Sequence, residues 1–266
     1  MNRTVIIDGD IIVYKCAEAI AEHIEVETDE DQDSLYQTIS WGSKSEAKNF
    51  IKKKIKEILK VTKSTEAVIC LSDAEENFRK DLLPHYKGNR KKVKPVFYHW
   101  IRQYFHDNYT TFERPTLEAD DLMGIIVTYP KKLKGISEGE KVLWSMDKDF
   151  KTIPCTFYRE KPNKEITVHT TSLDEANYYF MFQTLTGDLV DGYEGCKNIG
   201  VARARKLLAP FETECNLEEA WLVVKDAYLA NGFTEEEALV QARCARILRA
   251  EDYDFGKKEV KLWNML

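Results

Sequence analysis

Nine carboxylates fall in five short groups along the first three quarters of this chain, each at the end of an expected strand or helix. They are Asp8, Asp73, Glu118 with Asp120 and Asp121, Asp147 with Asp149, and Asp188 with Asp191. Two unit charges about 4 Å apart repel by about 4 kcal/mol at an effective dielectric near 20, so a fold that gathers these groups needs cations. Carboxylate oxygens select hard ions such as Mg²⁺ or Mn²⁺. The pattern therefore predicts two-metal phosphodiester chemistry.

A basic strip separates the second and third acidic groups. It holds seven Lys or Arg against one acid, namely Arg79, Lys80, Lys87, Arg90, Lys91, Lys92 and Lys94 against Asp81. The net charge of the chain is −6, but the residues outside the nine clustered carboxylates comprise 36 acids and 39 basic residues. An acidic centre beside a basic strip suits a polyanion held through metal ions. A solvated face is the alternative for the three lysines after Arg90.

Composition excludes several other classes of protein. With 266 residues, 43% of them hydrophobic, the chain can form one large domain or a core with an appendage. Its apolar runs are too short to span a membrane, and the acidic start predicts no secretory signal. Six scattered cysteines indicate free thiols in a reducing cytoplasm. There is no P-loop and no EF-hand spacing, so nucleotide triphosphate hydrolysis and that type of calcium site are not expected.

The elements that must position the acids alternate along the chain. Buried strands are expected at 5–7, 68–71 and 142–146, each ending beside an acid, and helices at 9–19, from Ser45 onward and at 118–127. This order predicts an α/β fold with a mainly parallel central sheet flanked by helices. In such sheets ligands gather at the carboxyl ends of the strands, where Asp8, Asp73 and Asp147 lie.

The remaining segments are less regular. Residues 22–34 are acid-rich and are interpreted as a solvated insertion, with a hairpin to 35–41 as the alternative. Residues 75–107 are expected to be helical or partly ordered, with a break near Pro95. From residue 172 onward the chain is expected to be mostly helical, with a final strand at 259–263.

The order of the acidic motifs resembles the flap-endonuclease/5′-nuclease superfamily. Those motifs are Asp8, Asp73, Glu118-Ala-Asp-Asp121, Asp147-Lys-Asp149 and Gly187-Asp-x-x-Asp191. The segments 86–90, 145–154 and 242–249 resemble more closely the replicative double-strand 5′→3′ DNA exonucleases of short-tailed phages. The resemblance spans most of the chain. It implies a PIN-like 5′-nuclease catalytic core over 1–185 and a helical DNA-binding region over 186–266 that contains a helix-three-turn-helix.

The resemblance also implies roles for the acids and for the basic motif. A first Mg²⁺ or Mn²⁺ would be held by Asp8, Asp73, Glu118 and Asp120, a second by Asp147, Asp149, Asp188 and Asp191, with Asp121 between the two. Lys87 and Arg90 would face the scissile phosphate from a helix and stabilise its developing charge. Tyr86 would stack on a terminal base.

Residues 192–200, followed by 201–208, resemble the helix-three-turn-helix of these nucleases. Its backbone N–H groups would bind duplex phosphates without reading sequence, and a K⁺ ion is a further expectation there. The expected DNA contacts are Arg79, Lys80, Lys91, Lys92, Gly195, Lys197, Gly200, Arg203 and Arg205. Gly192 stands where many relatives have Asn, and Asn198 where they have Gly; Asn tolerates a left-handed backbone better than most residues.

The expected activity is metal-dependent 5′→3′ exonucleolysis of duplex DNA with release of 5′ nucleotides, with RNA in RNA/DNA hybrids as a further substrate. The short segment between Arg90 and Pro115 favours a terminal exonuclease. The alternatives are a structure-specific flap endonuclease or RNase H at the same site, and a non-catalytic DNA-binding accessory, which would be expected to have lost metal ligands. Expected partners are duplex DNA with 5′ ends and replication proteins, in the cytoplasm of a phage host and without a membrane.

Overall fold

A six-stranded sheet forms the centre of the computed structural model, which describes residues 2–28, 35–89, 93–131 and 133–265. The strand order is β5-β4-β1-β6-β7-β8, and only the last pair is antiparallel. The strands are β1 (Arg3–Asp8), β4 (Glu66–Cys70), β5 (Thr110–Phe112), β6 (Glu140–Ser145), β7 (Thr156–Glu160) and β8 (Ile166–Thr170). The predicted α/β class with a mainly parallel sheet is confirmed.

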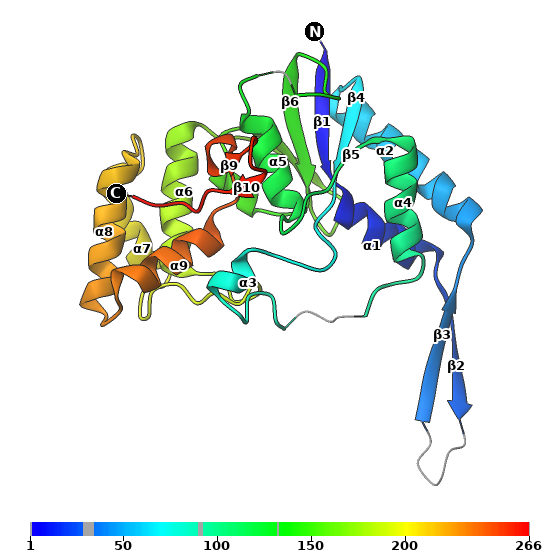
Figure 1. Cartoon of the computed structure of the whole chain (residues 1–266), viewed down its shortest axis with the longest axis horizontal. Helices are drawn as coiled ribbons and strands as arrows, with labels where there is room; N and C mark the ends of the chain where they lie inside the picture. The colour runs from blue at the N-terminus through cyan, green and yellow to red at the C-terminus, as the bar shows by residue number, and fades with distance from the viewer. Residues whose placement is uncertain (1, 29–34, 90–92, 132, 266) are drawn as a thin grey trace.

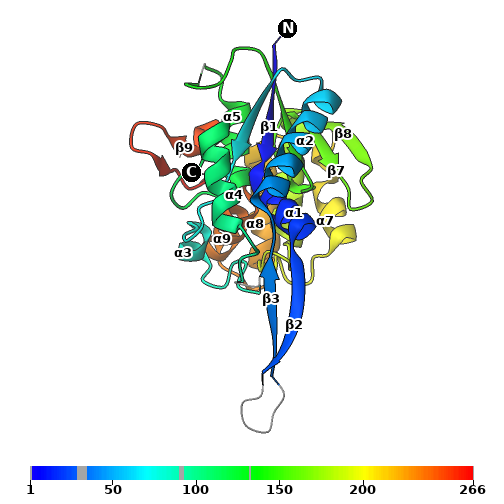
Figure 2. The same ribbon diagram turned by 90° about the vertical axis from the view of Figure 1, so that its right-hand side faces the viewer.

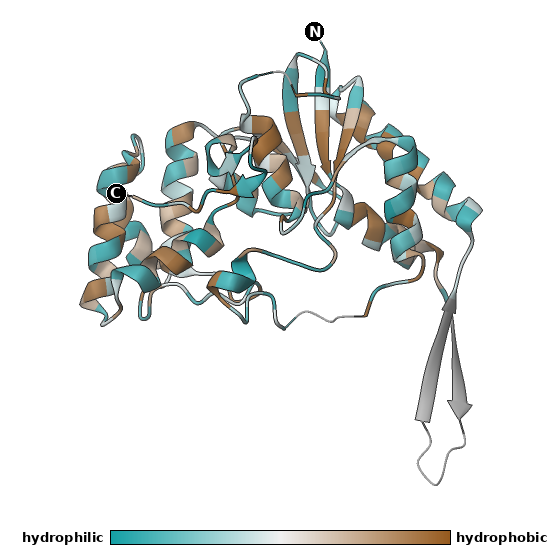
Figure 3. Cartoon of the chain, viewed as in Figure 1, coloured by the Kyte–Doolittle hydropathy of each residue, from teal (hydrophilic) through white to brown (hydrophobic). Residues whose placement is uncertain are grey.

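The central strands are apolar on both faces, as expected for a parallel sheet covered by helices. In β1, Ile6 pairs with Val68 of β4 and with Leu143 of β6, and all three are fully buried. The hydrophobic colouring of these strands stands out in Figure 3. Because β1, β4 and β6 run in the same direction, the residues that follow them emerge together at one edge of the sheet.

Successive side chains of a strand point to opposite faces, and this alternation forms two hydrophobic clusters. Val5 and Ile7 face α1 (Gly9–Ile20), α2 (Lys44–Thr62) and α4 (Tyr98–Asn108). Ile6 faces α5 (Ala119–Thr128) on the other side of the sheet. Figure 1 and Figure 2 show α1 and α2 on one side of the sheet and α5 on the other. The sheet edge that carries the acids is thereby fixed from both faces.

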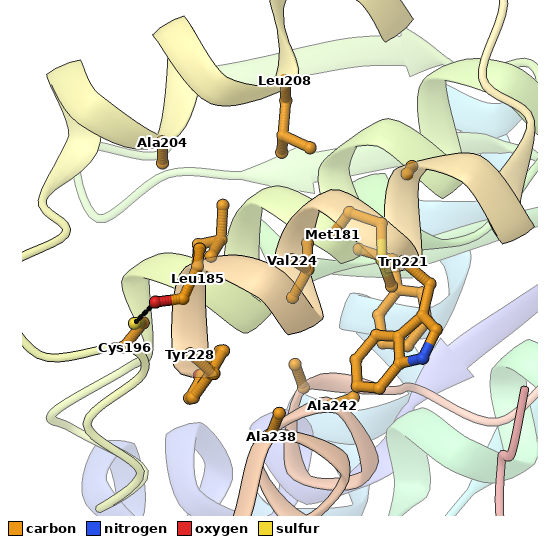
Figure 4. Packing of buried hydrophobic residues seen from close by; sticks show 14 of the residues in the cluster. Met181, Leu185, Cys196, Ala204, Leu208, Trp221, Val224, Tyr228, Ala238 and Ala242 are labelled. Carbon is orange, nitrogen blue, oxygen red and sulfur yellow. Dashed lines mark hydrogen bonds between the residues drawn. The ribbon is translucent and has the colours of Figure 1, made fainter. Parts of the chain in front are cut away.

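The helical part has its own hydrophobic cluster, around Met181, Trp221 and Tyr228 (Figure 4). It is built from α6 (Leu173–Thr186), α7 (Val201–Leu208), α8 (Leu217–Ala230) and α9 (Glu235–Ala245), and the short α3 (Arg79–Leu82) contacts α9. The division at residue 185 stays a prediction. Helix α6 crosses that point at its last turn and packs into the same cluster as the helices after it.

The acid-rich segment after α1 is a hairpin of β2 (Glu22–Thr28) and β3 (Leu35–Trp41), which projects from the body (Figure 1). The hairpin alternative is therefore confirmed, and the expectation of an irregular conformation is wrong for residues 22–28. The alternation of apolar and polar residues through His23–Thr28 was the signal for a strand. Residues 29–34 lie outside the described part of the chain.

Smaller elements complete the fold. Helix α2 is capped by Ser43 rather than by the expected Ser45, and the C-terminal strand is only β10 (Glu259–Val260), paired with β9 (Tyr253–Asp254). Short 3₁₀ turns are η1 (Asp149–Thr152), η2 (Ala209–Phe211) and η3 (Ala250–Asp252). Among the described residues, no helix is both long enough and apolar enough to cross a membrane.

Candidate active site

The ends of β1 and β6 bring the first acids together. Asp8 ends β1 and caps α1, because its Oδ1 accepts a hydrogen bond from the Ile11 amide at 3.3 Å. Its Oδ2 accepts from the Ser145 hydroxyl at 3.1 Å, which ties it to the end of β6. Just beyond, Asp147 Oδ1 accepts from the Asp149 amide at 2.8 Å and turns the chain into η1. Two neighbouring parallel strands thus deliver three carboxylates to one edge.

The start of α5 supplies the next acids. Glu118 is the N-cap, and Glu118 and Asp121 form a capping box. Asp120 projects from the first turn and lines a narrow cleft of about 20 Å³. The cleft is also lined by Glu118, Asp147, Asp149 and Asp191. Its size suits an ion or a water molecule rather than an organic ligand.

The carboxylates in and around the cleft disfavour one another's charges. Burial, followed by the charge of Asp10, raises the pKa of Asp8 to about 7. Burial, followed by Asp147, raises the pKa of Asp149 to about 7. For Asp120 the pKa lies well above its ordinary value, because of burial and then the charges of Asp8 and Asp147. The cleft is therefore short of positive charge.

The donor set fits divalent cations. Asp149 Oδ1 is buried without a hydrogen-bond partner, an arrangement that costs free energy unless a cation or water satisfies the oxygen. Hard oxygen donors are those that Mg²⁺ and Mn²⁺ prefer. In the described part of the chain, however, no three His, Cys, Asp or Glu side chains already converge in a metal-ligating arrangement. Glu118 instead directs its oxygens to basic side chains.

Lys87 closes the cleft from the basic strip. It sits in a turn with φ of 52°, and its amide donates to the Asp191 carbonyl at 2.8 Å. Its ammonium group bonds Glu118 and lies 3.4 Å from Asp191 Oδ2. Burial would raise the pKa of Glu118, but Lys87 and then Arg79 outweigh it and hold that pKa at about 2. The prediction that Lys87 projects from a helix is wrong, because Lys87 lies in a turn.

Tyr86 is placed differently from its predicted role. It is buried and stacks on Tyr193, with ring centroids 6.4 Å apart. Its hydroxyl donates to Glu118 at 3.1 Å and lies 3.4 Å from Asp191 Oδ2. The prediction that Tyr86 stacks on a terminal base is wrong, since its ring is covered by the protein. It orients two cleft carboxylates instead.

Arg79 was predicted to contact DNA, but the structure buries it. Its guanidinium group donates to both oxygens of Asp121, at 2.7 and 2.8 Å, and to Glu118 at 3.1 Å. It also donates to the carbonyls of Cys244 and Arg246. The prediction is therefore wrong for Arg79. Asp121 is likewise fully buried; it also accepts from the amides of Leu248 and Glu118, and it does not line the cleft.

Asp73 lies beside the cleft rather than in it. Its two oxygens accept from the amides of Glu75 at 3.0 Å and Thr116 at 2.7 Å. Burial would raise the pKa of Asp73, but these backbone hydrogen bonds lower it. Its assignment as a metal ligand stays a prediction, and its direct contacts in the structure are with the backbone.

Asp10 is an acid near the site that our sequence reasoning missed. It accepts from the Ser72 amide at 3.1 Å and pairs with Arg102 at 3.0 Å. Its charge also acts on Asp8. The signal was the Asp8-Gly9-Asp10 spacing at the end of β1, which is the same as that of Asp147 and Asp149 after β6.

The last acidic pair lies in a tight loop between α6 and α7. Asp188 Oδ1 accepts from the Val190 amide at 2.8 Å, and Lys148 Nζ lies 3.7 Å from Asp188 Oδ2. The loop depends on close glycine packing. Gly195 has φ of +71°, and a Cβ there would meet the Gly187 amide nitrogen at 2.4 Å.

The turn that precedes α7 has the expected shape. Asn198 adopts φ of +63°, so it takes the left-handed conformation in place of glycine. Gly200 is the N-cap of α7. The predicted DNA contacts Lys80, Lys197, Arg203 and Arg205 are all exposed, whereas Gly195 is buried. Arg90, Lys91 and Lys92 lie outside the described residues, so their roles stay predictions.

Comparison with known proteins places this geometry in a family. Residues 3–174 match the family model described as 5′-3′ exonuclease, N-terminal resolvase-like domain. The chain belongs to the 5′-3′ exonuclease family. It is 33% identical over 216 residues to the exonuclease of Escherichia phage T7, with 70% of each chain covered. It is 28% identical over 200 residues to the flap endonuclease of Escherichia phage T5, covering 66% of this chain and 67% of the relative.

Solved structures agree on the fold of this exonuclease. The T5 D15 protein co-crystallised with metal ions matches with a TM-score of 0.61 at 16% identity, over 92% of this chain and 90% of that chain. A T5 D15 flap endonuclease in a pseudo-enzyme–product complex with DNA and metal ions matches with a TM-score of 0.60 at 16% identity, over 92% and 89%. The predicted family and nuclease class are confirmed; the chain is a 5′-3′ exonuclease of the phage T7 and T3 type.

Proposed function

We propose that this exonuclease hydrolyses phosphodiester bonds of duplex DNA from 5′ ends with two divalent ions held by the carboxylates in and around the acidic cleft. The observation that carries the proposal is the cleft itself: five carboxylates line it, and Lys87 closes it. Such a site is electrostatically incomplete without cations. The T5 neighbours crystallised with metal ions are consistent with this requirement.

The ligands fall into two groups around the cleft. Asp8, Asp73, Glu118 and Asp120 would hold the first ion. Asp147, Asp149, Asp188 and Asp191 would hold the second. When bound, Mg²⁺ or Mn²⁺ ions in such a site activate an attacking water and stabilise the leaving oxygen. Asp121 supports the first group indirectly, through its contact with Arg79.

Lys87 has the position to bind the phosphate that is cut. Its ammonium group is shared between Glu118 and Asp191, so it can turn from these carboxylates to a phosphate oxygen once cations neutralise them. A cation preorganised at that point stabilises the negative charge that develops on the phosphate. Tyr86 and Arg79 position Glu118 and do not touch the substrate. Arg90 is proposed to assist Lys87.

The duplex would lie across the turn before α7. Exposed Lys197, Arg203 and Arg205 and the amide of Gly200 offer sequence-independent phosphate contacts, with Lys80 nearer the cleft. We also propose a K⁺ ion at this turn. RNA in RNA/DNA hybrids is proposed as a second substrate, and replication proteins are proposed as partners. We place the enzyme in the cytoplasm of a phage host, with roles in replication, primer removal or host DNA breakdown.

A duplex labelled at the 5′ end of one strand tests this function. We expect Mg²⁺-dependent release of labelled mononucleotide and none in EDTA. Because the chain is also related to a T5 flap endonuclease, flap cutting or RNase H activity at the same cleft is the second candidate. Release of longer labelled fragments would support that candidate. Duplex binding without any release would refute both.

A further inference from the structure

A buried segment that follows α9 lines one wall of the acidic cleft. We call residues 246–250 the linking segment. Arg246, Ile247, Leu248 and Arg249 are all buried, and Ile247 lines the cleft. Because these four residues belong to neither a helix nor a strand, their contacts with other elements fix the segment in place.

On one side, the linking segment is fixed to α5, the helix whose start carries acids of the first ion group. The Leu248 amide donates to Asp121 Oδ1 at 3.1 Å. The Ala250 amide donates to Thr128 Oγ1 at 2.8 Å. Between these two bonds the backbones lie so close that a Cβ at Gly124 would overlap the Leu248 carbonyl oxygen. The linking segment therefore follows α5 from its first turn to its last.

On the other side, Arg249 reaches the turn that carries Asp149. Its guanidinium group donates to the Thr152 carbonyl at 2.8 Å and to Asn177 Oδ1, on α6, at 2.9 Å. Thr152 ends η1, which begins at Asp149, and its hydroxyl donates to the Asp149 carbonyl at 2.8 Å. Two successive hydrogen bonds therefore connect Arg249 to the backbone of a carboxylate that lines the cleft.

The buried charge of Arg249 is not accounted for by an ion pair. Burial, and then the charge of Arg246, lower the pKa of Arg249 to about 9. Arg246 pairs with Glu251 and Asp252. Both acceptors of Arg249 are neutral, and burying a charge among neutral partners costs free energy. What the guanidinium group supplies here is geometry, because its planar fork holds two acceptors in a fixed relation.

We propose that Arg249 is a positioning residue, which fixes η1 relative to α5 so that the carboxylates for the two ions keep their spacing. The inference rests on the proposed function and assigns to the linking segment the alignment of the two ion groups. Two ions clamp a scissile phosphate when they lie about 3.5–4 Å apart. Residues that orient metal ligands without touching the metal change metal affinity by about 10–100-fold when they are replaced.

Binding of Mn²⁺ to the DNA-free protein, counted by electron paramagnetic resonance, tests this role without any cleavage. Arg249→Met removes both hydrogen bonds and the buried charge at a similar length, whereas Arg249→Lys can still donate to one acceptor. Arg243→Met is the matched control, because Arg243 is an arginine of α9 that donates to the Trp263 carbonyl and to Glu236, within the helical part. Asp149→Asn identifies the ion that the second group holds. Circular dichroism establishes that each variant is folded.

We expect wild type and Arg243→Met to bind two ions with the same affinities. Arg249→Met should bind one ion as wild type does and the other at least about tenfold more weakly. The weakened ion should be the one that Asp149→Asn weakens, and Arg249→Lys should recover part of the loss.

Wild-type affinity for both ions in Arg249→Met, or equal weakening of both, would overturn the inference and leave the exonuclease assignment intact. If Arg249→Met does not fold, the same two outcomes in Arg249→Lys decide the matter. A wild-type protein that binds fewer than two Mn²⁺ ions would refute the two-ion site of the proposed function and the inference together.

Discussion

Replacing Arg79 by methionine should cost stability rather than DNA affinity. Arg79 is buried and donates at 2.7 and 2.8 Å to the two oxygens of Asp121, which is itself fully buried. Methionine fills a similar volume but leaves the Asp121 carboxylate uncompensated. Removing one partner of a buried pair costs about 3–5 kcal/mol. The loss of the bonds to the Cys244 and Arg246 carbonyls acts in the same direction.

Urea unfolding followed by circular dichroism measures this change. We expect the free energy of unfolding of Arg79→Met to fall by about 3–5 kcal/mol. In Arg79→Met/Asp121→Leu, which removes both charges, part of that loss should be recovered. The rest stays because the amides of Leu248 and Glu118 lose their acceptor. Lys80→Met is the matched control, because Lys80 is exposed and should change stability by less than about 0.5 kcal/mol.

If Arg79→Met lowered the free energy of unfolding by less than about 1 kcal/mol, the reasoning would be refuted, because the ion pair would then not be buried in solution. The reasoning would also be refuted if Arg79→Met/Asp121→Leu were no more stable than Arg79→Met. Loss of duplex affinity at unchanged stability would instead restore the original prediction that Arg79 contacts DNA.

The remaining predictions concern the cleft, the loop and pH. Lys87→Ala should lower the single-turnover cleavage rate by about 10²–10³-fold with little change in duplex affinity. The control Lys53→Ala, on α2, should change neither quantity. An unchanged cleavage rate in Lys87→Ala would refute a catalytic role for Lys87. Gly195→Ala should lower the melting temperature, because its Cβ would meet Gly187 at 2.4 Å, while Gly200→Ala meets nothing within 4 Å; equal melting temperatures would contradict the packing. Because the folded pKa values of Asp8 and Asp149 are raised to about 7, the folded state binds more protons than the unfolded state, and in EDTA stability should fall as pH rises from about 4 to about 7. Added Mg²⁺ should remove that fall, and a melting temperature that rises with pH in EDTA would contradict the raised pKa values.

Local features of the site could be predicted from the sequence. Asp8 ends β1 and Asp147 follows β6 by two residues, so the shared direction of these parallel strands gathers them, whereas the acids at the start of α5 were predictable as a helix N-terminus. The left-handed turn at Asn198 was also predictable, because it depends on one residue's backbone preference.

The features that sequence reasoning missed depend on distant contacts. Arg79 is buried by carbonyls of Cys244 and Arg246, about 165 residues further along the chain, and no local pattern reveals that contact. Tyr86 is covered by Tyr193 for the same reason. In both cases a basic or aromatic residue next to the catalytic motif was assigned to the substrate, whereas tertiary packing had made it a support for the acids.

The central claim is that the acidic cleft performs the cleavage, and Asp147→Asn tests it most directly. The measurement is the single-turnover release of nucleotide from a 5′-labelled duplex in Mg²⁺, together with duplex affinity in Ca²⁺. Asp226→Asn is the control, because Asp226 is an exposed acid on α8. We predict that Asp147→Asn lowers cleavage by at least about 10³ while duplex affinity and the behaviour of Asp226→Asn match wild type. Cleavage by Asp147→Asn at the wild-type rate would contradict the assignment of this cleft as the catalytic centre.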